Sequence, residues 1–205
     1  MTFSLLETLR LETGQLPALD AHLDRMAASA RHFGWSLDRS ALCTLARQRA
    51  TEHPAGVWRL RLLCAPDGDL SAQALPLVDE PVPLRAALAR TPIRSGDPHL
   101  AHKTTDRAVY EAHRAAQPDL QEVLLWNERG ELTEFTTGTV VLRLGGRLMT
   151  PPLAAGVLPG VARAAALATG EISEALLTRE HLTQAAEVWH LNSLRGWQPV
   201  VLSPN

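Results

Sequence analysis

Lysine occurs only once in this chain of 205 residues, at Lys103, and 19 of its 20 basic side chains are arginine. A lysine amine can lose its proton, form a Schiff base and move protons, whereas an arginine guanidinium stays charged. The retained lysine is therefore a candidate for covalent chemistry. The alternative is an arginine-rich composition with one stray surface lysine, and the count by itself favours that alternative.

The segments before Lys103 combine strand and helix patterns. Period-two alternation, turn residues and helical spacing predict strands at 3–11, 16–19, 57–65, 70–77 and 84–88, and helices at 20–33 and about 40–51. Asp20 is the expected N-cap of the first helix and Gly34 its end, while Asp38 or Ser40 starts the second. Ser95-Gly96-Asp97-Pro98 lies in the best linker candidate.

The C-terminal half carries more strands than helices. The same signals predict a helix at about 105–116, strands at 122–127, 131–135, 139–144, 147–150, 188–191 and 198–202, and helices at 161–168 and 180–185. We therefore expect a strand-rich α+β fold in two lobes. Residues 1–93 would form the N-terminal lobe, 94–100 the linker and 101–205 the C-terminal lobe.

The composition argues against several classes of protein. A formal net charge of −2 without a basic stripe disfavours nucleic acid or an anionic membrane as a partner. No run approaches the ~20 apolar residues of a membrane span, and the start lacks the features of a signal peptide, so we expect a cytoplasmic protein. Cys43 and Cys64 suggest free thiols in a reducing compartment. Neither the histidines nor Asp67-Gly68-Asp69 form a convincing metal site, so we expect no metal.

Five motifs, in order along almost the whole chain, resemble those of the class IV aminotransferases, the fold-type-IV pyridoxal phosphate (PLP) enzymes. They are Leu19-x-x-His22-Leu23-x-Arg25-x-x-x-Ser29-Ala30, His102-Lys103 with Arg107, Gly130-Glu131-Leu132-Thr133-Glu134, Thr150-Pro151-Pro152-Leu153 followed by Leu158-Pro159-Gly160-Val161-Ala162-Arg163, and Asn192-Ser193-Leu194-Arg195-Gly196-Trp197-Gln198-Pro199-Val200. The family includes branched-chain and D-amino-acid aminotransferases and 4-amino-4-deoxychorismate lyases. Each motif is weak alone, but together they favour a catalytic Lys103.

The resemblance implies a fold, a cofactor and an assembly. The fold would resemble D-amino-acid aminotransferase, with an N-terminal α/β lobe and a C-terminal strand-rich pseudo-barrel lobe, and the cofactor would be PLP. In family members a neighbouring subunit completes the site, so a homodimer is expected. The family usually has further residues before the strand at Phe3, which form an initial hairpin and a loop on the substrate side.

Two residues would then carry the chemistry. Lys103 would hold the cofactor through a Schiff base and later act as the base that moves protons at its reactive carbon. Glu134 would face the pyridine nitrogen and keep it protonated, which makes the ring an electron sink. The alternative for Glu134 is a surface glutamate beside a turn, but its place after Gly130 and its distance from Lys103 favour the cofactor role.

The phosphate of the cofactor needs hydrogen-bond donors, and two segments could supply them. Gly160, Val161 and Ala162 open a predicted helix, whose free N–H groups and dipole suit a dianion. Ser193 and Leu194 lie in a predicted turn that could provide a hydroxyl and a further N–H group.

An arginine on the strand at 57–65 would add a bidentate charge to the phosphate. Arg59 and Arg61 project from the same strand face, so periodicity leaves the choice open, while the order of residues resembles the family best with Arg61. The chain also departs from the family pattern. Thr136-Thr137-Gly138-Thr139 stands where a Ser-Asn pair is frequent, and Ala162 replaces a common threonine. These departures bear more on the substrate than on the cofactor.

The closest resemblance is to the subgroup that is fused to aminodeoxychorismate synthase or encoded beside it, through segments such as 102–110 and 192–197. We therefore expect a lyase that converts 4-amino-4-deoxychorismate to 4-aminobenzoate and pyruvate on the route to folate, with that synthase as a candidate partner. One alternative is a class IV aminotransferase acting on branched-chain or D-amino acids. A second is a cofactor-less binding or assembly subunit.

Overall fold

The computed structural model describes residues 3–203, which divide into two compact units. Unit 1 holds the chain up to Asp79 together with His102–Asp106, and unit 2 holds Glu80–Ala101 and the chain from Arg107 onward. In this division the expected linker at 94–100 lies inside unit 2. The outer limits of the two expected lobes, residues 1 and 205, lie outside the described residues.

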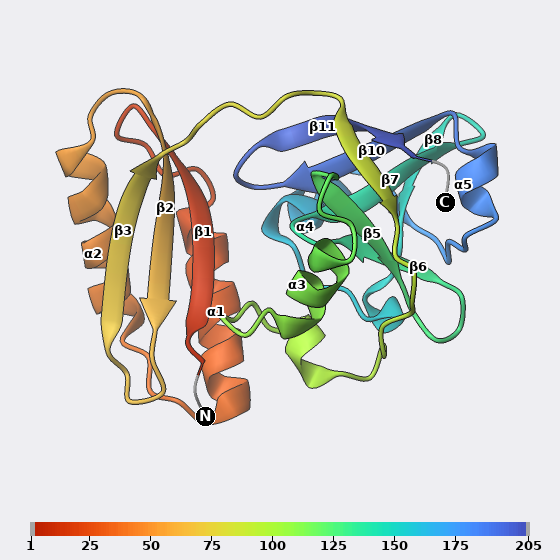
Figure 1. Cartoon of the computed structure of the whole chain (residues 1–205). Coiled ribbons are helices and arrows are strands. Elements are labelled where there is room, and N and C mark those ends of the chain that lie inside the picture. The colour runs from red at the N-terminus through yellow and green to blue at the C-terminus, as the bar shows by residue number, and fades with distance from the viewer. Residues whose placement is uncertain (1–2, 204–205) are drawn as a thin grey trace. The chain divides into compact units, whose positions relative to one another are not determined.

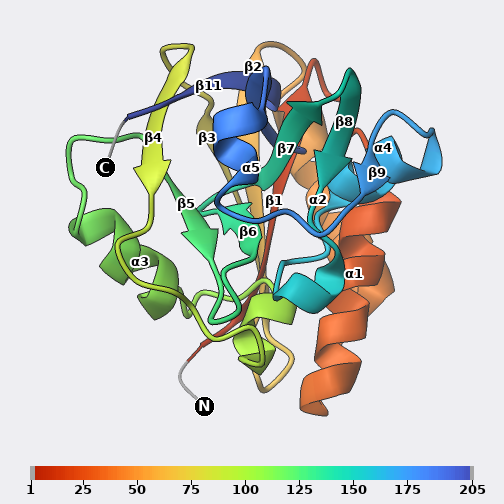
Figure 2. The ribbon, with the colours of Figure 1, turned by 90° about the vertical axis from the view of Figure 1, so that its right-hand side faces the viewer.

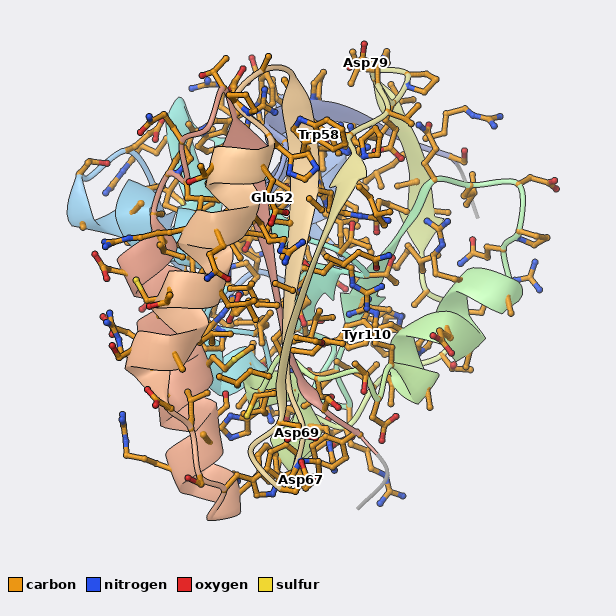
Figure 3. All side chains as sticks on the ribbon, turned by 90° about the vertical axis from the view of Figure 1, so that its left-hand side faces the viewer. Glu52, Trp58, Asp67, Asp69, Asp79 and Tyr110 are labelled. Carbon is orange, nitrogen blue, oxygen red and sulfur yellow. The ribbon has the colours of Figure 1, made fainter. Side chains whose placement is uncertain are left out.

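Unit 1 is a three-stranded antiparallel sheet with two helices on one face (Figures 1 and 3). The strands β1 (Leu5–Glu12), β2 (Val57–Cys64) and β3 (Leu70–Pro76) are neighbours in that order. The helices α1 (Leu19–Phe33) and α2 (Arg39–Glu52) cover the face to which every second residue of β1 and β2 points. Most of these residues are apolar, and the fully buried ones include Leu5, Leu9, Leu11, Leu60 and Leu62, while Glu7 is a buried carboxylate on the same face.

The connection between β2 and β3 is a tight hairpin turn. Gly68 adopts φ +93°, which favours glycine, and its N–H group donates to Ala65 O. Asp67 Oδ1 accepts a hydrogen bond from Asp69 N, so this carboxylate closes the turn. Figure 3 labels both aspartates at this end of the hairpin and Trp58 at the opposite end.

The start of α1 differs from the prediction. The strand expected at 16–19 is wrong: the tight turn closes with a single bridge between Glu12 and Gln15, and the helix begins at Leu19. Asp20 is not the N-cap, because Ala18 occupies that position with φ 58°. Asp20 lies instead in the first turn, where its charge still complements the helix dipole.

The other helix boundaries of unit 1 follow the sequence signals. Gly34 ends α1 with φ 69°, as predicted. Asp38 is the N-cap of α2, and its side chain accepts a hydrogen bond from Ala41 N at 2.9 Å. These two residues confirm the predicted end of the first helix and start of the second.

The segment His102–Asp106 belongs to unit 1 because it pairs with the outer edge of β1. Leu5 and Thr104 form an antiparallel bridge there. The pairing keeps this segment extended, so the helix predicted from about residue 105 begins only at Ala108.

Unit 2 is an eight-stranded sheet in the order β10-β11-β4-β5-β6-β7-β8-β9. Its strands are β4 (Leu84–Leu88), β5 (Glu122–Trp126), β6 (Leu132–Phe135), β7 (Thr139–Leu144), β8 (Arg147–Thr150), β9 (Ser173–Glu174), β10 (Glu187–Asn192) and β11 (Gly196–Leu202). Because β10 also pairs with β7, six strands close into a ring that β8 and β9 extend. This strand-rich, barrel-like unit confirms the expected α+β fold.

The helices of unit 2 are short. They are α3 (Ala108–Ala115), α4 (Val161–Ala168) and α5 (His181–Gln184), with 3-10 turns η1 (Pro98–Ala101) and η2 (Leu153–Ala155). Figure 2 shows α3 beside β5 and α4 on the other side of the strands, near β9. Across residues 3–203, none of the helices combines the length and the apolar character that crossing a bilayer requires.

The interior of the ring is a single apolar cluster. Its buried members on five ring strands are Leu84, Ala86, Leu124, Leu132, Phe135, Val140, Leu142 and Val200. β4 contributes to this cluster because it pairs in parallel with both β5 and β11. These long-range pairings place β4 in unit 2, although local sequence patterns grouped it with the strands before it.

Candidate active site

Lys103 is half-buried on the segment that extends the sheet of unit 1. Its carbonyl oxygen accepts a hydrogen bond from Leu6 N at 2.9 Å, next to the bridge between Leu5 and Thr104. Residues opposite each other in an antiparallel pair project from the same face. Thr104 therefore shares the helix-covered face with Leu5, and Lys103 projects with Leu6 from the face that α1 and α2 leave uncovered, the helix-free face of unit 1.

The strand register orders the two candidate arginines relative to Lys103. Leu6, opposite Lys103, pairs with Leu63 of β2, so these three residues form one row on the helix-free face. Arg61 is two residues from Leu63 and stands one row further, roughly 7 Å along the strand. Arg59 stands two rows further, roughly 14 Å along the strand. Both arginines share the face of Lys103, and Arg61 lies nearer to it.

Glu134 lies on β6 with only 5% of its surface exposed. Its two carboxylate oxygens accept different hydrogen bonds. Tyr110 Oη donates to Oε1 at 2.7 Å, and Leu158 N donates to Oε2 at 3.3 Å. Both donors are neutral groups, which stabilise a negative charge without cancelling it.

The predicted phosphate segment forms the start of α4. Gly160 is the N-cap, Val161 is buried and Ala162 is half-buried. A Cβ atom on Gly160 would lie 3.1 Å from Thr139 Oγ1, so a glycine permits the close approach of this segment to β7. The first N–H groups of a helix have no acceptor within it. This end of α4 therefore has the chemistry of an anion cradle.

The second predicted anion segment is the turn between β10 and β11. Asn192 Oδ1 accepts hydrogen bonds from Leu194 N at 3.1 Å and from Arg195 N at 2.8 Å. Ser193 is half-buried in the same turn. Because Leu194 N–H already donates within the turn, the anion-binding roles of Ser193 and Leu194 stay predictions.

The start of α4 and the turn between β10 and β11 both contact β6, β7 or the loop between these two strands. Leu158 N reaches Glu134 at the end of β6, and Gly160 lies against Thr139 at the start of β7. Asn192 Nδ2 donates to Thr137 O at 3.3 Å. Unit 2 thus brings together three of the motifs that the resemblance singled out, while Lys103, Arg59 and Arg61 belong to unit 1.

The two threonines that depart from the family pattern have internal partners. The hydroxyls of Thr136 and Thr137 both donate to the buried carboxylate of Glu122. His190 Nε2 lies 3.2 Å from Thr137 Oγ1. Burial lowers the pKa of His190, although the nearby charge of Glu122 opposes this shift. The threonine side chains therefore anchor the loop to β5 and β10.

Sequence patterns assigned no role to Tyr110 or Arg107. The guanidinium of Arg107 lies 4.5 Å from the centroid of the Tyr110 ring, and its Nη2 donates to Thr136 O at 2.5 Å. The available signal was composition, because Tyr110 is the only tyrosine in the chain and follows the only lysine closely. Its partner Glu134 could not be found without the pairing of α3 against the strands.

Comparison with known proteins identifies the family. A family model described as amino-transferase class IV matches residues 4–202. A protein of Schizosaccharomyces pombe named "Putative aminodeoxychorismate lyase" is 31% identical over 194 residues, which cover 90% of this chain and 84% of that protein. A crystal structure of a "Putative amino-acid aminotransferase" from Mesorhizobium loti matches with a TM-score of 0.91 and 35% identity, covering 98% of this chain and 100% of that one.

A more distant structure shows the same fold. 4-Amino-4-deoxychorismate lyase from Pseudomonas aeruginosa has a TM-score of 0.82 at 24% identity, covering 97% of this chain and 82% of that one. The chain belongs to the class IV aminotransferase family and has the type IV fold of that family. It is accordingly a PLP-dependent enzyme of the lyase or transaminase kind.

Each unit by itself holds residues of a type that suits that cofactor. Glu134 is a buried carboxylate stabilised by neutral donors, which suits a protonated ring nitrogen. The start of α4 suits a phosphate dianion. Lys103 and Arg61 supply an amine and a cation from one face of a sheet. The described residues thus include each type of group that PLP requires.

Proposed function

We propose that this chain is a PLP-dependent 4-amino-4-deoxychorismate lyase, which forms 4-aminobenzoate and pyruvate. The observation that carries the PLP part of the proposal is the buried Glu134 carboxylate with its neutral donors. The choice of lyase is supported by the 31% identity to the protein named as such from Schizosaccharomyces pombe. The motifs at 102–110 and 192–197 support it as well.

Lys103 has two tasks in the proposed reaction. Its amine would hold the cofactor through a Schiff base and would be free once the substrate is bound. The freed amine would take the proton from the ring carbon that bears the amine of the substrate. The bond between the ring and the enolpyruvyl oxygen would then break, the ring would become aromatic, and the departing enolpyruvate would gain a proton to become pyruvate. PLP, when bound, supplies the electron sink for this step. Glu134 keeps the ring nitrogen of the cofactor protonated, which strengthens that sink.

Binding and orientation would come from the remaining residues. The N–H groups of Val161 and Ala162, at the start of α4, would hold the phosphate with the help of Gly160, whose missing side chain leaves room. Arg61 would add a charge-assisted hydrogen bond. The nearer position of Arg61 to the row of Lys103 favours it over Arg59 for this role.

The test is incubation of the PLP-loaded protein with 4-amino-4-deoxychorismate. The expected result is the release of 4-aminobenzoate and pyruvate in equal amounts, measured by chromatography. The matched control is Lys103→Arg, which keeps the positive charge but cannot form the Schiff base. A PLP-loaded protein that releases no 4-aminobenzoate rejects the lyase.

A second candidate is an amino-acid aminotransferase on the same fold. It is favoured by the 35% identity to the Mesorhizobium loti protein, which covers all of that chain. A half-reaction with branched-chain or D-amino acids separates the two activities. A transaminase leaves the cofactor as pyridoxamine phosphate, whereas the lyase returns pyridoxal phosphate, and their absorbance spectra differ.

A further inference from the structure

The single tyrosine of the chain is directed at the carboxylate of Glu134. Tyr110 lies near the start of α3 (Figure 3), and its hydroxyl donates to Glu134 Oε1 at 2.7 Å. This bond connects α3 with β6, both within unit 2. It therefore fixes one oxygen of the carboxylate, while Leu158 N engages the other at 3.3 Å.

Arg107 holds Tyr110 in this position. Its guanidinium lies over the tyrosine ring, 4.5 Å from the centroid, and it donates to Thr136 O, two residues beyond Glu134. A cation over an aromatic ring is attracted to the ring face. It also draws electron density away from the phenol, which makes the hydroxyl a stronger donor. Arg107 thus contacts both the ring of Tyr110 and the backbone two residues after Glu134.

The electrostatics of the pair keep the proton on the tyrosine. Burial raises the pKa of Tyr110, and the charge of Glu134 together with their hydrogen bond raises it further. The phenol consequently remains a neutral donor over the working range of pH. A neutral donor favours the ionised carboxylate and preserves its charge for a second partner.

We propose that Tyr110 is a positioning residue of the active site, which holds the Glu134 carboxylate ionised and oriented toward the ring nitrogen of PLP. Arg107 supports Tyr110 from the opposite side of its ring. The inference rests on the proposed role of Glu134 and deepens it. Tyr110 acts only through Glu134 and takes no proton from the substrate.

A purely structural role makes a different prediction. The ring of Tyr110 packs against an apolar cluster of Ala89, Ile93, Leu100, Val123 and Leu125. Tyr110→Phe retains the ring and this packing but removes the hydroxyl. A structural role therefore predicts an unchanged cofactor site in Tyr110→Phe, whereas a positioning role predicts a changed one.

The experiment compares the wild type with Tyr110→Phe, Glu134→Gln and the double variant. A hydrogen bond to a charged group lost in Tyr110→Phe should weaken PLP binding by about tenfold, measured by equilibrium dialysis. The pH at which the visible band of the bound cofactor changes should shift as well. In the Glu134→Gln background, Tyr110→Phe should have little further effect, because both changes interrupt the same interaction.

A second readout needs no cofactor. Because the chain has one tyrosine, the ultraviolet band of tyrosinate reports Tyr110 alone. In the wild type this band should appear only at a pH well above the usual range of tyrosine. In Glu134→Gln the removal of the neighbouring charge should bring the band to lower pH. An equal titration of the two proteins, both still folded by circular dichroism, would show that the two side chains are not coupled, and would overturn the inference.

The outcomes separate this inference from the proposed function. If the wild type binds PLP and Tyr110→Phe binds it within about twofold, with an unchanged band profile, the positioning role is rejected and the proposed function stands. A full effect of Tyr110→Phe in the Glu134→Gln background also rejects it. If the wild type takes up no PLP, the proposed function and this inference are both overturned.

Discussion

His190 lies so close to Gly138 that a Cβ atom on this glycine would be 2.3 Å from Nε2 of the histidine ring. The histidine is 1% exposed and cannot move into solvent. We expect Gly138→Ala to destabilise the protein by about 1–3 kcal/mol through overpacking. A thermal unfolding scan should show a melting temperature that is lower by several degrees.

The matched control for this substitution is Gly96→Ala. The added methyl group at Gly96 meets no atom within 4 Å among the residues that the structure describes. Its effect on the free energy of unfolding should stay within about 0.5 kcal/mol. Equal destabilisation by both substitutions would contradict the steric argument for Gly138.

The single lysine makes a covalent test specific. We expect borohydride reduction of the PLP-loaded protein to attach the cofactor irreversibly to the peptide that contains Lys103, because reduction converts a Schiff base to a stable amine. Mass spectrometry of the digest locates the modification. Lys103→Ala should lose it entirely. No modification in the wild type would favour the cofactor-less assembly subunit, and modification elsewhere would reject Lys103 as the Schiff-base residue.

Arg61 and Arg59 should differ in their effect on cofactor affinity. Arg61→Ala should weaken PLP binding by about 10- to 100-fold, since a charge-assisted hydrogen bond to the phosphate is lost. Arg59→Ala, one row further from Lys103, should change it by less than about threefold. Equilibrium dialysis gives both values. Pyridoxal, which lacks the phosphate, is the control ligand, and Arg61→Ala should leave its binding unchanged.

Unit 1 contains a buried ion pair that should make its stability depend on pH. Glu7 is 1% exposed and accepts hydrogen bonds from Arg25 at 2.6 and 2.8 Å and from His22 at 2.6 Å. Burial raises the pKa of Glu7, but Arg25 and His22 together outweigh burial and hold it below the usual 4.5. This contribution to stability is present above the unfolded pKa and is lost as the pH falls through the lower folded pKa.

Removing the cation tests this pair. Arg25→Met should destabilise the protein by about 3–5 kcal/mol at neutral pH, because a buried carboxylate is left without its charge partner. Its deficit in urea unfolding should shrink in acid, where Glu7 is protonated in both proteins. Arg39→Met, which breaks the exposed pairs with Asp20 and Asp24, should cost less than about 1 kcal/mol. A comparable loss in Arg39→Met would refute the burial argument.

Several elements were predictable from sequence because their signals are local. The bounds of β7, β8 and α4 match the predicted ranges. Gly145-Gly146 separates β7 from β8, and Pro159-Gly160 directly precedes α4. The start of α1 was missed because Ala18 adopts a left-handed conformation that nothing in its side chain requires. Local signals determine whether a segment forms a helix or a strand. They fail to give its boundary where tertiary structure selects an unusual backbone conformation.

The arrangement of the candidate site was less predictable. The alternation in β2 placed Arg59 and Arg61 on one face but could not order them, because the order depends on the pairing of β1 with residues near Lys103. The partnership of Tyr110 with Glu134 depends on where α3 packs, which is equally a long-range property. The order of the motifs predicted the cofactor residues, and the register of strand pairing was needed to identify the residues that support them.

The seam between β4 and β11 joins Leu84 to Val200 in a parallel pairing. During synthesis on the ribosome, almost the entire remainder of the chain must therefore be made before β11, one of the two neighbours of β4, exists. Such a late, distant closure is slow relative to local contacts. The nascent second unit would expose the edges of β4 and β10 until its final strand emerges, which makes that interval the one in which chaperone assistance matters most.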